Sequence, residues 1–210
     1  MRYRTVIFDF DGTLADSLEE TRTVFNQLAE DYNLTPIAAD TMHSLRHLSM
    51  MQLIDHLQIP KRKLPAILSR GTTMMRANIS RLPLTEGMAT VLPELRKHVH
   101  MFGILTSNSS ANVDLFLRAH GIRGLFNFIS STSKLTGKAK HIRAIRKTFS
   151  LQPEEMLYVG DEIRDIKAAR KAGIDIAAVT WGFNSPESLS KSCPQYLISH
   201  PDEFLQLIHQ

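Results

Sequence analysis

The sequence lacks the features that would tie it to an oxidising compartment or to a membrane. Its 210 residues include one cysteine, Cys193, so no intramolecular disulfide can form and no cluster has the spacing of a zinc site. No apolar run approaches the roughly 18 residues that a membrane span requires, and the first residues do not form the apolar segment of a signal peptide. We therefore expect a cytoplasmic protein that contacts no membrane.

The segment in which basic residues are concentrated contains no Phe, Tyr or Trp. The formal net charge is +4, and residues 134–147 hold six basic side chains and no acid. A nucleic-acid binder would interleave such charges with aromatic stacking platforms. Instead, Ile142 and Ile145 recur at a helical interval, which predicts an amphipathic helix with a solvated basic face. The charge balance suits a small phosphorylated metabolite, and we expect no nucleic-acid partner.

Short apolar runs alternate with helical patterns along most of the chain. This alternation predicts βαβ units and a Rossmann-like α/β fold, a parallel sheet with helices on both faces in three layers. The runs of strand length cover residues 5–8, 101–105, 126–129, 156–159, 176–179 and 196–198. Helices are expected at 19–32, 40–57, 61–79, 85–98, 113–120 and 203–208. The first two runs are separated by helical patterns alone, so we expect residues 17–82 to form an inserted all-helical cap domain, and 1–16 with 83–210 to form the α/β core.

Two acids follow the first apolar run. Asp9 and Asp11 flank Phe10, a spacing at which both carboxylates can point the same way from an extended backbone. Gly12 then allows a sharp turn. Charges taken from water must be paired or bind a metal, so the pair indicates a site, although a plain Asp-Gly turn explains the dipeptide equally well.

A second acidic group follows the fourth run, where Gly160 precedes Asp161, Glu162 and, one helical turn on, Asp165. Taken alone, this could be a helix cap with a solvated ion pair from Asp165 to Arg164 or Lys167. In a parallel sheet, however, the carboxyl ends of the strands meet at one edge. Several carboxylates meeting there cannot all stay ionised without a cation, and oxygen ligands favour Mg²⁺.

Polar residues also follow the second run. Thr106, Ser107 and Asn108 lie at a strand end that leads into a helix, where hydroxyls and backbone amides could hold an anionic oxygen. A plain capping box explains them as well. Lys138, after Gly137, could bring an ammonium to the same place, although several basic residues lie near it.

These motifs, in this order, resemble those of the haloacid dehalogenase-like hydrolase superfamily, and the inserted helical segment is similar to the cap of its phosphoglycolate phosphatase-like branch. The resemblance covers essentially the whole chain. One departure is Ala139, where many relatives have Pro after the lysine. The matching positions are Asp9 to Leu14 with Asp16 and Ser17; Leu105, Thr106 and Asn108; Gly137 and Lys138; and Gly160, Asp161, Glu162 and Asp165.

The resemblance implies a phosphatase that acts through an aspartyl-phosphate. Asp9 would be the nucleophile and Asp11 the general acid and base. Thr106 and Lys138 would neutralise charge on the transferring phosphoryl group, with Gly12, Ser107 and Asn108 also binding phosphate. Mg²⁺ would be held by Asp9, Asp161 and the backbone carbonyls of Phe10 and Asp11, with Asp165 and Glu162 in support.

Several alternatives remain at this point. A dehalogenase of the same fold needs neither Asp11 nor a metal, so the other acids count against it. A phosphomutase, a pyrophosphatase or a non-catalytic binding protein of the superfamily could share the motifs, and a monomer and a homodimer are both open. Substrate choice is expected to lie in the cap, where Arg46 or His47 could contact the non-phosphate end of a phosphoglycolate-like or sugar phosphate substrate, or could simply be solvated. Methionines such as Met50, Met51, Met74 and Met75 are expected to fill the core in and around the cap.

Overall fold

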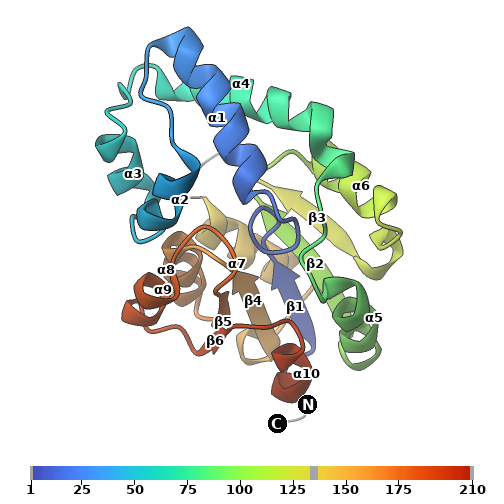
Figure 1. The fold of residues 1–210 in the computed structure, drawn as a ribbon. Coiled ribbons are helices and arrows are strands. Elements are labelled where there is room, and N and C mark those ends of the chain that lie inside the picture. Colours follow the sequence, from blue (N-terminus) through green and yellow to red (C-terminus); the bar gives the residue numbers. More distant parts are fainter. Residues whose placement is uncertain (1, 133–136, 209–210) are drawn as a thin grey trace.

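Six parallel strands form the centre of the computed structural model, which describes residues 2–132 and 137–208 (Figure 1). The first strand lies inside the sheet, between the second and the fourth, and the sheet order is β3-β2-β1-β4-β5-β6. The strands are β1 (Thr5–Phe8), β2 (Met101–Thr106), β3 (Phe128–Ser131), β4 (Met156–Gly160), β5 (Asp175–Val179) and β6 (Tyr196–Ile198). This confirms the predicted Rossmann-like α/β fold.

The alternating side chains of β1 show why the sheet is covered on both faces. Val6 and Phe8 belong to one apolar cluster and Ile7 to the other, as the two-residue period of a strand requires. The first cluster includes residues of α5 (Met88–His98), α6 (Ser110–Ala119) and α10 (Glu203–Ile208). The second includes residues of α7 (Lys138–Thr148), α8 (Ile163–Ala172) and α9 (Pro186–Lys191). Short 3₁₀ turns lie at η1 (Ile79–Arg81), η2 (Arg123–Leu125) and η3 (Pro153–Glu155).

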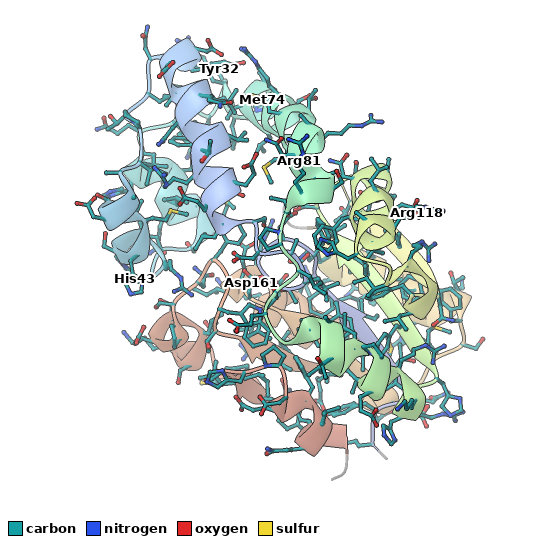
Figure 2. The ribbon with its side chains drawn as sticks, turned by 45° about the vertical axis from the view of Figure 1, so that its right-hand side comes forward. Tyr32, His43, Met74, Arg81, Arg118 and Asp161 are labelled. Carbon is teal, nitrogen blue, oxygen red and sulfur yellow. The ribbon has the colours of Figure 1, made fainter. Side chains whose placement is uncertain are left out.

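A helical unit lies over the carboxyl ends of the central strands (Figure 1). It comprises α1 (Leu18–Tyr32), α2 (Ala39–Leu45), α3 (Met50–His56) and α4 (Leu64–Asn78), with α1 packed on α4. The two connections to the core run side by side, because the Asp16 amide donates to the Pro83 carbonyl at 2.9 Å. Division into two domains at residues 17 and 82 stays a prediction. In Figure 2, Asp161 lies between this cap and the core helices, and Tyr32 lies at the far end of α1.

The expected single helix over residues 40–57 is wrong, because residues 46–49 separate α2 from α3. Ser49 and Gln52 form a capping box that starts α3. The Asn184 side-chain amide, from the core, donates to the carbonyls of Arg46 at 3.0 Å and Leu48 at 2.8 Å. These carbonyls therefore point to the core instead of continuing a helix.

Other boundaries move by a few residues. The helix predicted from residue 85 begins at Met88, after Gly87 at φ +85°, and the one predicted from 113 begins at Ser110, where the Ser109 side chain caps it. The third strand begins at Phe128, not at 126. The basic helix is described from Lys138, and residues 134–136 lie outside the described part of the chain. Over that described part, each helix is too short or too polar to cross a membrane.

Candidate active site

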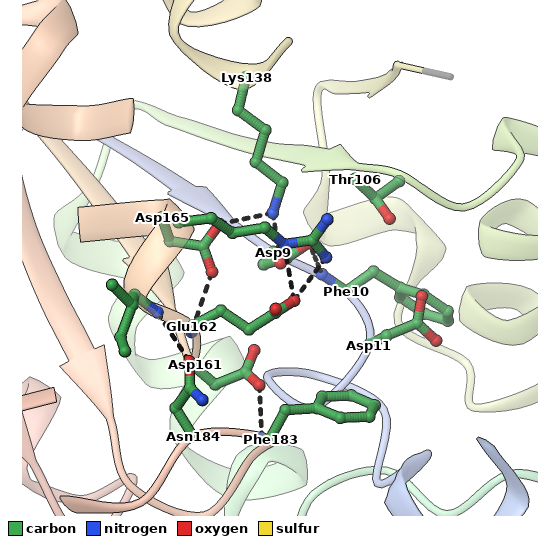
Figure 3. A network of polar contacts seen from close by, with 12 residues as sticks. Asp9, Phe10, Asp11, Thr106, Lys138, Asp161, Glu162, Asp165, Phe183 and Asn184 are labelled. Atoms are coloured by element: carbon green, nitrogen blue, oxygen red, sulfur yellow. Dashed lines mark hydrogen bonds and ion pairs between the residues drawn. The ribbon is translucent and has the colours of Figure 1, made fainter. Parts of the chain in front are cut away.

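Asp9 leaves β1 at the centre of the sheet edge, between β2 and β4 (Figure 3). Its amide donates to the Val159 carbonyl at 2.7 Å, which extends the β1–β4 pairing by one residue. Asp9 is only 3% exposed, and its Oδ1 accepts a hydrogen bond from the Phe10 amide at 2.8 Å. The sheet thus holds one carboxylate in a fixed orientation at the point where the strand order reverses.

Lys138 brings a buried positive charge to Asp9. It begins α7, its side chain is 3% exposed, and its Nζ forms an ion pair with Asp9 Oδ2 and a second one, at 2.7 Å, with Asp165 Oδ1. Although burial alone would lower it, the carboxylates of Asp165 and Asp9 raise the pKa of Lys138 well above its usual value. Lys138 is therefore a fixed ammonium that bridges two carboxylates, one directly after β1 and one in the first turn of α8.

The second acidic group is equally buried. Asp161 Oδ1 accepts the Thr13 hydroxyl and Oδ2 accepts the Phe183 amide, both at 2.7 Å. Asp165 Oδ2 accepts the Glu162 amide at 3.1 Å and so completes a capping box at the start of α8. Asp165 also pairs with Lys138, so the alternative of a solvated ion pair with Arg164 or Lys167 is wrong.

Burial and nearby negative charge raise the pKa values of Asp9 and Asp161. Burial raises the pKa of Asp9 to about 7, against the opposing effect of the Lys138 ammonium. Burial, and then the charges of Glu162 and Asp9, raise the pKa of Asp161 well above its usual value. The edge therefore holds more buried negative charge than its own cations balance.

This donor set fits a hard divalent cation. One carboxylate oxygen from each of Asp9, Glu162 and Asp165 lies within 4.8 Å of the others, and all three residues are buried. Asp161 lies beside this group, with its oxygens engaged by Thr13 and Phe183. Carboxylates without nitrogen or sulfur ligands are typical of Mg²⁺ sites.

Glycine is required at position 12 because the two acidic segments lie very close to each other there. It lies at φ +73°, and a Cβ there would stand 2.4 Å from Asp161 Oδ2 and 2.6 Å from a Phe183 ring carbon. In the same turn the Phe10 carbonyl accepts the amides of Leu14 at 2.9 Å and Ala15 at 3.0 Å. That carbonyl is hydrogen-bonded inside the turn, and its expected contact with a metal stays a prediction.

Asp11 faces the end of β2. The Asn108 side-chain amide donates to Asp11 Oδ2 at 3.0 Å, and the Asn108 backbone amide donates to the Thr106 hydroxyl at 2.9 Å. Burial raises the pKa of Asp11, while the Asn108 hydrogen bond opposes the rise. Ser109 is the residue that caps α6, so Thr106 and Asn108 are not the helix cap that the alternative interpretation required.

The structure adds Arg164 to the site. Its Nε donates to Glu162 Oε1 at 2.8 Å, and the pair lies partly buried beside Asp9 and Asp165. Nothing in the sequence assigned Arg164 to the site, because the neighbouring motif gives no sign that a charged residue next to the acids turns inward. Thr13 and Phe183 were also missed as partners of Asp161. Thr13 falls inside the first motif, but the Phe183 contact is made by a backbone amide that no residue pattern encodes.

The side chains of the two cap candidates contact backbone carbonyls. The Arg46 guanidinium crosses to the core and donates to the Thr180 carbonyl at 2.7 Å. His47 is exposed, and its ring contacts the Ser44 carbonyl. Contact of either residue with a substrate stays a prediction, whereas the packing of Arg46 against the core loop is an observed contact between cap and core.

Comparison with known proteins agrees with this geometry. The model of the haloacid dehalogenase-like hydrolase family matches residues 6–179. A phosphoglycolate phosphatase of Synechococcus elongatus is 34% identical over 207 residues, which cover 99% of this chain and 98% of that protein. A pyrophosphatase, PpaX, of Oceanobacillus iheyensis is 24% identical, with 99% and 98% covered.

Solved structures share the fold at low identity. A haloacid dehalogenase-like family hydrolase from Streptococcus pneumoniae has a TM-score of 0.83 at 24% identity, and 98% of each chain is covered. A predicted phosphatase from Clostridium acetobutylicum has a TM-score of 0.85 at 19% identity, and 99% of each chain is covered. The family match and the similar phosphoglycolate phosphatase, which agree with the shared fold and the buried acidic edge, show that the chain belongs to the haloacid dehalogenase-like hydrolase family and is a phosphatase hydrolase.

Proposed function

We propose that the protein is a Mg²⁺-dependent phosphatase that hydrolyses a small phosphate monoester through an aspartyl-phosphate on Asp9. The observation that carries this proposal is the pairing of the buried Asp9 carboxylate with Lys138, with the Asp11 carboxyl two residues further on. A nucleophile next to a fixed positive charge can receive a phosphoryl group, and a second acid nearby can handle the proton.

The proposed hydrolysis takes place in two steps. An Asp9 carboxylate oxygen forms a bond to phosphorus while the phosphorus–ester oxygen bond breaks, and Asp11 gives its proton to the leaving alcohol oxygen. Asp11 then takes a proton from water, whose oxygen displaces Asp9 from phosphorus and releases inorganic phosphate. Because burial raises the pKa of Asp11, the acid can be protonated for the first step, and the Asn108 hydrogen bond stabilises the carboxylate for the second.

The remaining polar groups bind the phosphoryl oxygens. Thr106 ends β2, Ser107 and Asn108 follow it, and Lys138 approaches from α7. Their fixed donors meet the charge that spreads over the phosphoryl oxygens in the transition state. Gly12 lets the loop after β1 pass close to this place.

Asp9, Asp161 and the Asp11 carbonyl would hold Mg²⁺, with Glu162 and Asp165 in support. The Phe10 carbonyl, which accepts backbone hydrogen bonds within the turn, stays a predicted member of this set. When bound, the ion neutralises negative charge on the carboxylates and on the phosphate. The oxygen-only donor set and the excess of buried carboxylates support this assignment.

Phosphoglycolate and sugar phosphates are the first substrates to test, the former because a relative that aligns over nearly the whole chain is named for it. Pyrophosphate is a second candidate, since PpaX also aligns over nearly the whole chain. A phosphomutase would share these residues but would exclude water, so it would release no free phosphate. Cytoplasmic location and a monomeric or homodimeric state stay predictions.

The test is phosphate release from a panel of monoesters and pyrophosphate, with Mg²⁺ and with EDTA. Asp9→Asn should lower the rate by at least about 10³-fold, because an amide cannot form the phosphoenzyme, and far-ultraviolet circular dichroism should be unchanged. Asp202→Asn, an exposed change of the same charge, is the control. A tenth of the wild-type rate in Asp9→Asn would contradict the nucleophile assignment, and equal rates in EDTA would contradict the metal requirement.

A further inference from the structure

A cavity of about 240 Å³ lies between the acidic edge and the cap. At its catalytic end it is lined by Asp11, Ser107 and Asn108, the residues that the proposed reaction places around the ester oxygen. At its other end it reaches the cap helices α1 and α4. Whatever is attached to the phosphate must therefore occupy the cap end.

The cap end is apolar. Among the described residues that line the cavity, α1, α3 and α4 contribute no charged side chain. Thr21 and Thr72 are the only polar ones that these helices contribute within that lining, and the Thr72 hydroxyl already donates to the Leu68 carbonyl at 2.9 Å. The apolar members are Val24, Phe25, Leu28, Met50, Ile67, Leu68 and Met75, with Phe183 joining them from the core.

The charged residues of the lining all belong to the core. They are Asp11, Glu162 and Arg164, and Arg164 is paired with Glu162. An anionic group at the cap end would therefore find two acids and a single, already paired cation. Arg46, the cap cation that the sequence suggested, donates to a core carbonyl and is not part of this lining.

We infer that the alcohol portion of the substrate is uncharged and largely apolar, so that the protein prefers phosphate esters of small aliphatic or aromatic alcohols over 2-phosphoglycolate and sugar phosphates. This inference rests on the proposed function and refines its substrate class. Apolar contact at the cap end favours an alkyl or aryl group. A carboxylate or several hydroxyls there would lose water without gaining hydrogen-bond partners.

A matched pair of esters tests the inference on the wild-type protein. Isobutyl phosphate and 2-phosphoglycolate have nearly the same shape and differ in that one ends in two methyl groups and the other in a carboxylate. With Mg²⁺ present, we expect kcat/KM from free-phosphate release to be at least tenfold higher for isobutyl phosphate, mainly through KM. Benzyl phosphate should also be hydrolysed better than glycerol 3-phosphate.

A pair of variants places a cation inside or outside the cavity. Leu68 lines the cavity and is 40% exposed, so Leu68→Arg can be accommodated at the rim. Leu115, on α6, is 44% exposed and lies outside the lining. We expect Leu68→Arg to raise the ratio of kcat/KM for 2-phosphoglycolate over isobutyl phosphate at least fivefold, and Leu115→Arg to change that ratio less than twofold.

The possible outcomes distinguish failure of the apolar-substrate inference from failure of the proposed phosphatase function. If the wild-type protein prefers 2-phosphoglycolate to isobutyl phosphate, the inference of an apolar substrate is overturned but the phosphatase proposal stands. The same holds if Leu68→Arg and Leu115→Arg shift the ratio of kcat/KM for the two esters equally. No phosphate release from any ester, with p-nitrophenyl phosphate included as a generic substrate, overturns both.

Discussion

The two ends of the active site, the acidic edge of the core and the cap end of the cavity, differ in how tightly their side chains are fixed. At the core end, Lys138 is almost fully buried and forms ion pairs with Asp9 and Asp165, which are buried as well. At the cap end, Leu68 is 40% exposed and contributes through shape alone. Removing one charge at the core end leaves another buried without a partner, whereas the cap end can be altered by a methyl group at little cost. Chemistry is thus fixed by the core, and substrate choice can vary in the cap.

The largest effect is expected at the core end, for Lys138→Met. Without the ammonium, Asp9 and Asp165 remain buried and uncompensated, which should lower the free energy of unfolding by about 3–5 kcal/mol. Phosphate release should fall by about 10²–10³-fold, because a donor to the phosphoryl oxygens is lost. Urea denaturation in EDTA and a phosphate-release assay would measure the two effects.

Lys140→Met provides the control, since Lys140 lies on the same helix and is exposed. It should change neither stability nor rate appreciably. If Lys138→Met were destabilised by less than about 1 kcal/mol, the ammonium would not be holding the acids together, and the contrast between the two ends of the active site would weaken.

Most of the core end could be predicted from the sequence. In a parallel sheet, residues after the strands share one edge, so the positions of Asp9, Thr106 and Asp161 after apolar runs were enough to place them together. The ion pair of Lys138 with both acids was less predictable, because several basic residues near it had the same pattern. The inward turn of Arg164 depends on Glu162 and on burial, and neither is visible in the spacing of the motif.

The cap was harder to predict for two physical reasons. The break between α2 and α3 depends on Asn184, more than 130 residues away, whose amide binds two carbonyls of the break. The apolar faces of α1 and α4 look the same in the sequence whether they pack on a core or line a cavity. Among the methionines expected to fill the core, Met75 is buried but also lines the cavity, while Met51 is 51% exposed.

A smaller effect is expected for Asn108→Ala, at the boundary between the two ends. Asn108 opposes the rise in the pKa of Asp11 by donating to its carboxylate. Its removal should raise that pKa further, so Asp11 stays protonated to higher pH. The limb of the pH profile on which Asp11 loses the proton that it gives to the leaving group should therefore move to higher pH, and the maximal rate should fall by about tenfold or more.

The measurement is kcat/KM for one ester across the pH range, with Asn78→Ala as the control because Asn78 lies in the cap and donates to Glu20. That control should retain the wild-type profile. A profile of Asn108→Ala that moves to lower pH would show that Asn108 does not stabilise the carboxylate of Asp11.

The smallest effect should come from Gly71→Ala at the cap end. Gly71 lies within α4 and lines the cavity, and a Cβ there would meet Leu28 at 3.5 Å and Val24 at 3.9 Å, which is ordinary contact. Alanine should therefore fit, and its higher helix propensity should add about 0.5–1 kcal/mol of stability. The added methyl narrows the cavity, so kcat/KM should fall a few-fold for benzyl phosphate and less for isobutyl phosphate. Ser69→Ala, on the same helix but outside the lining, separates propensity from cavity volume. If the two esters were affected equally, the methyl group would act through the helix and not through the space that the alcohol occupies, and the cap end would lose its role in substrate choice.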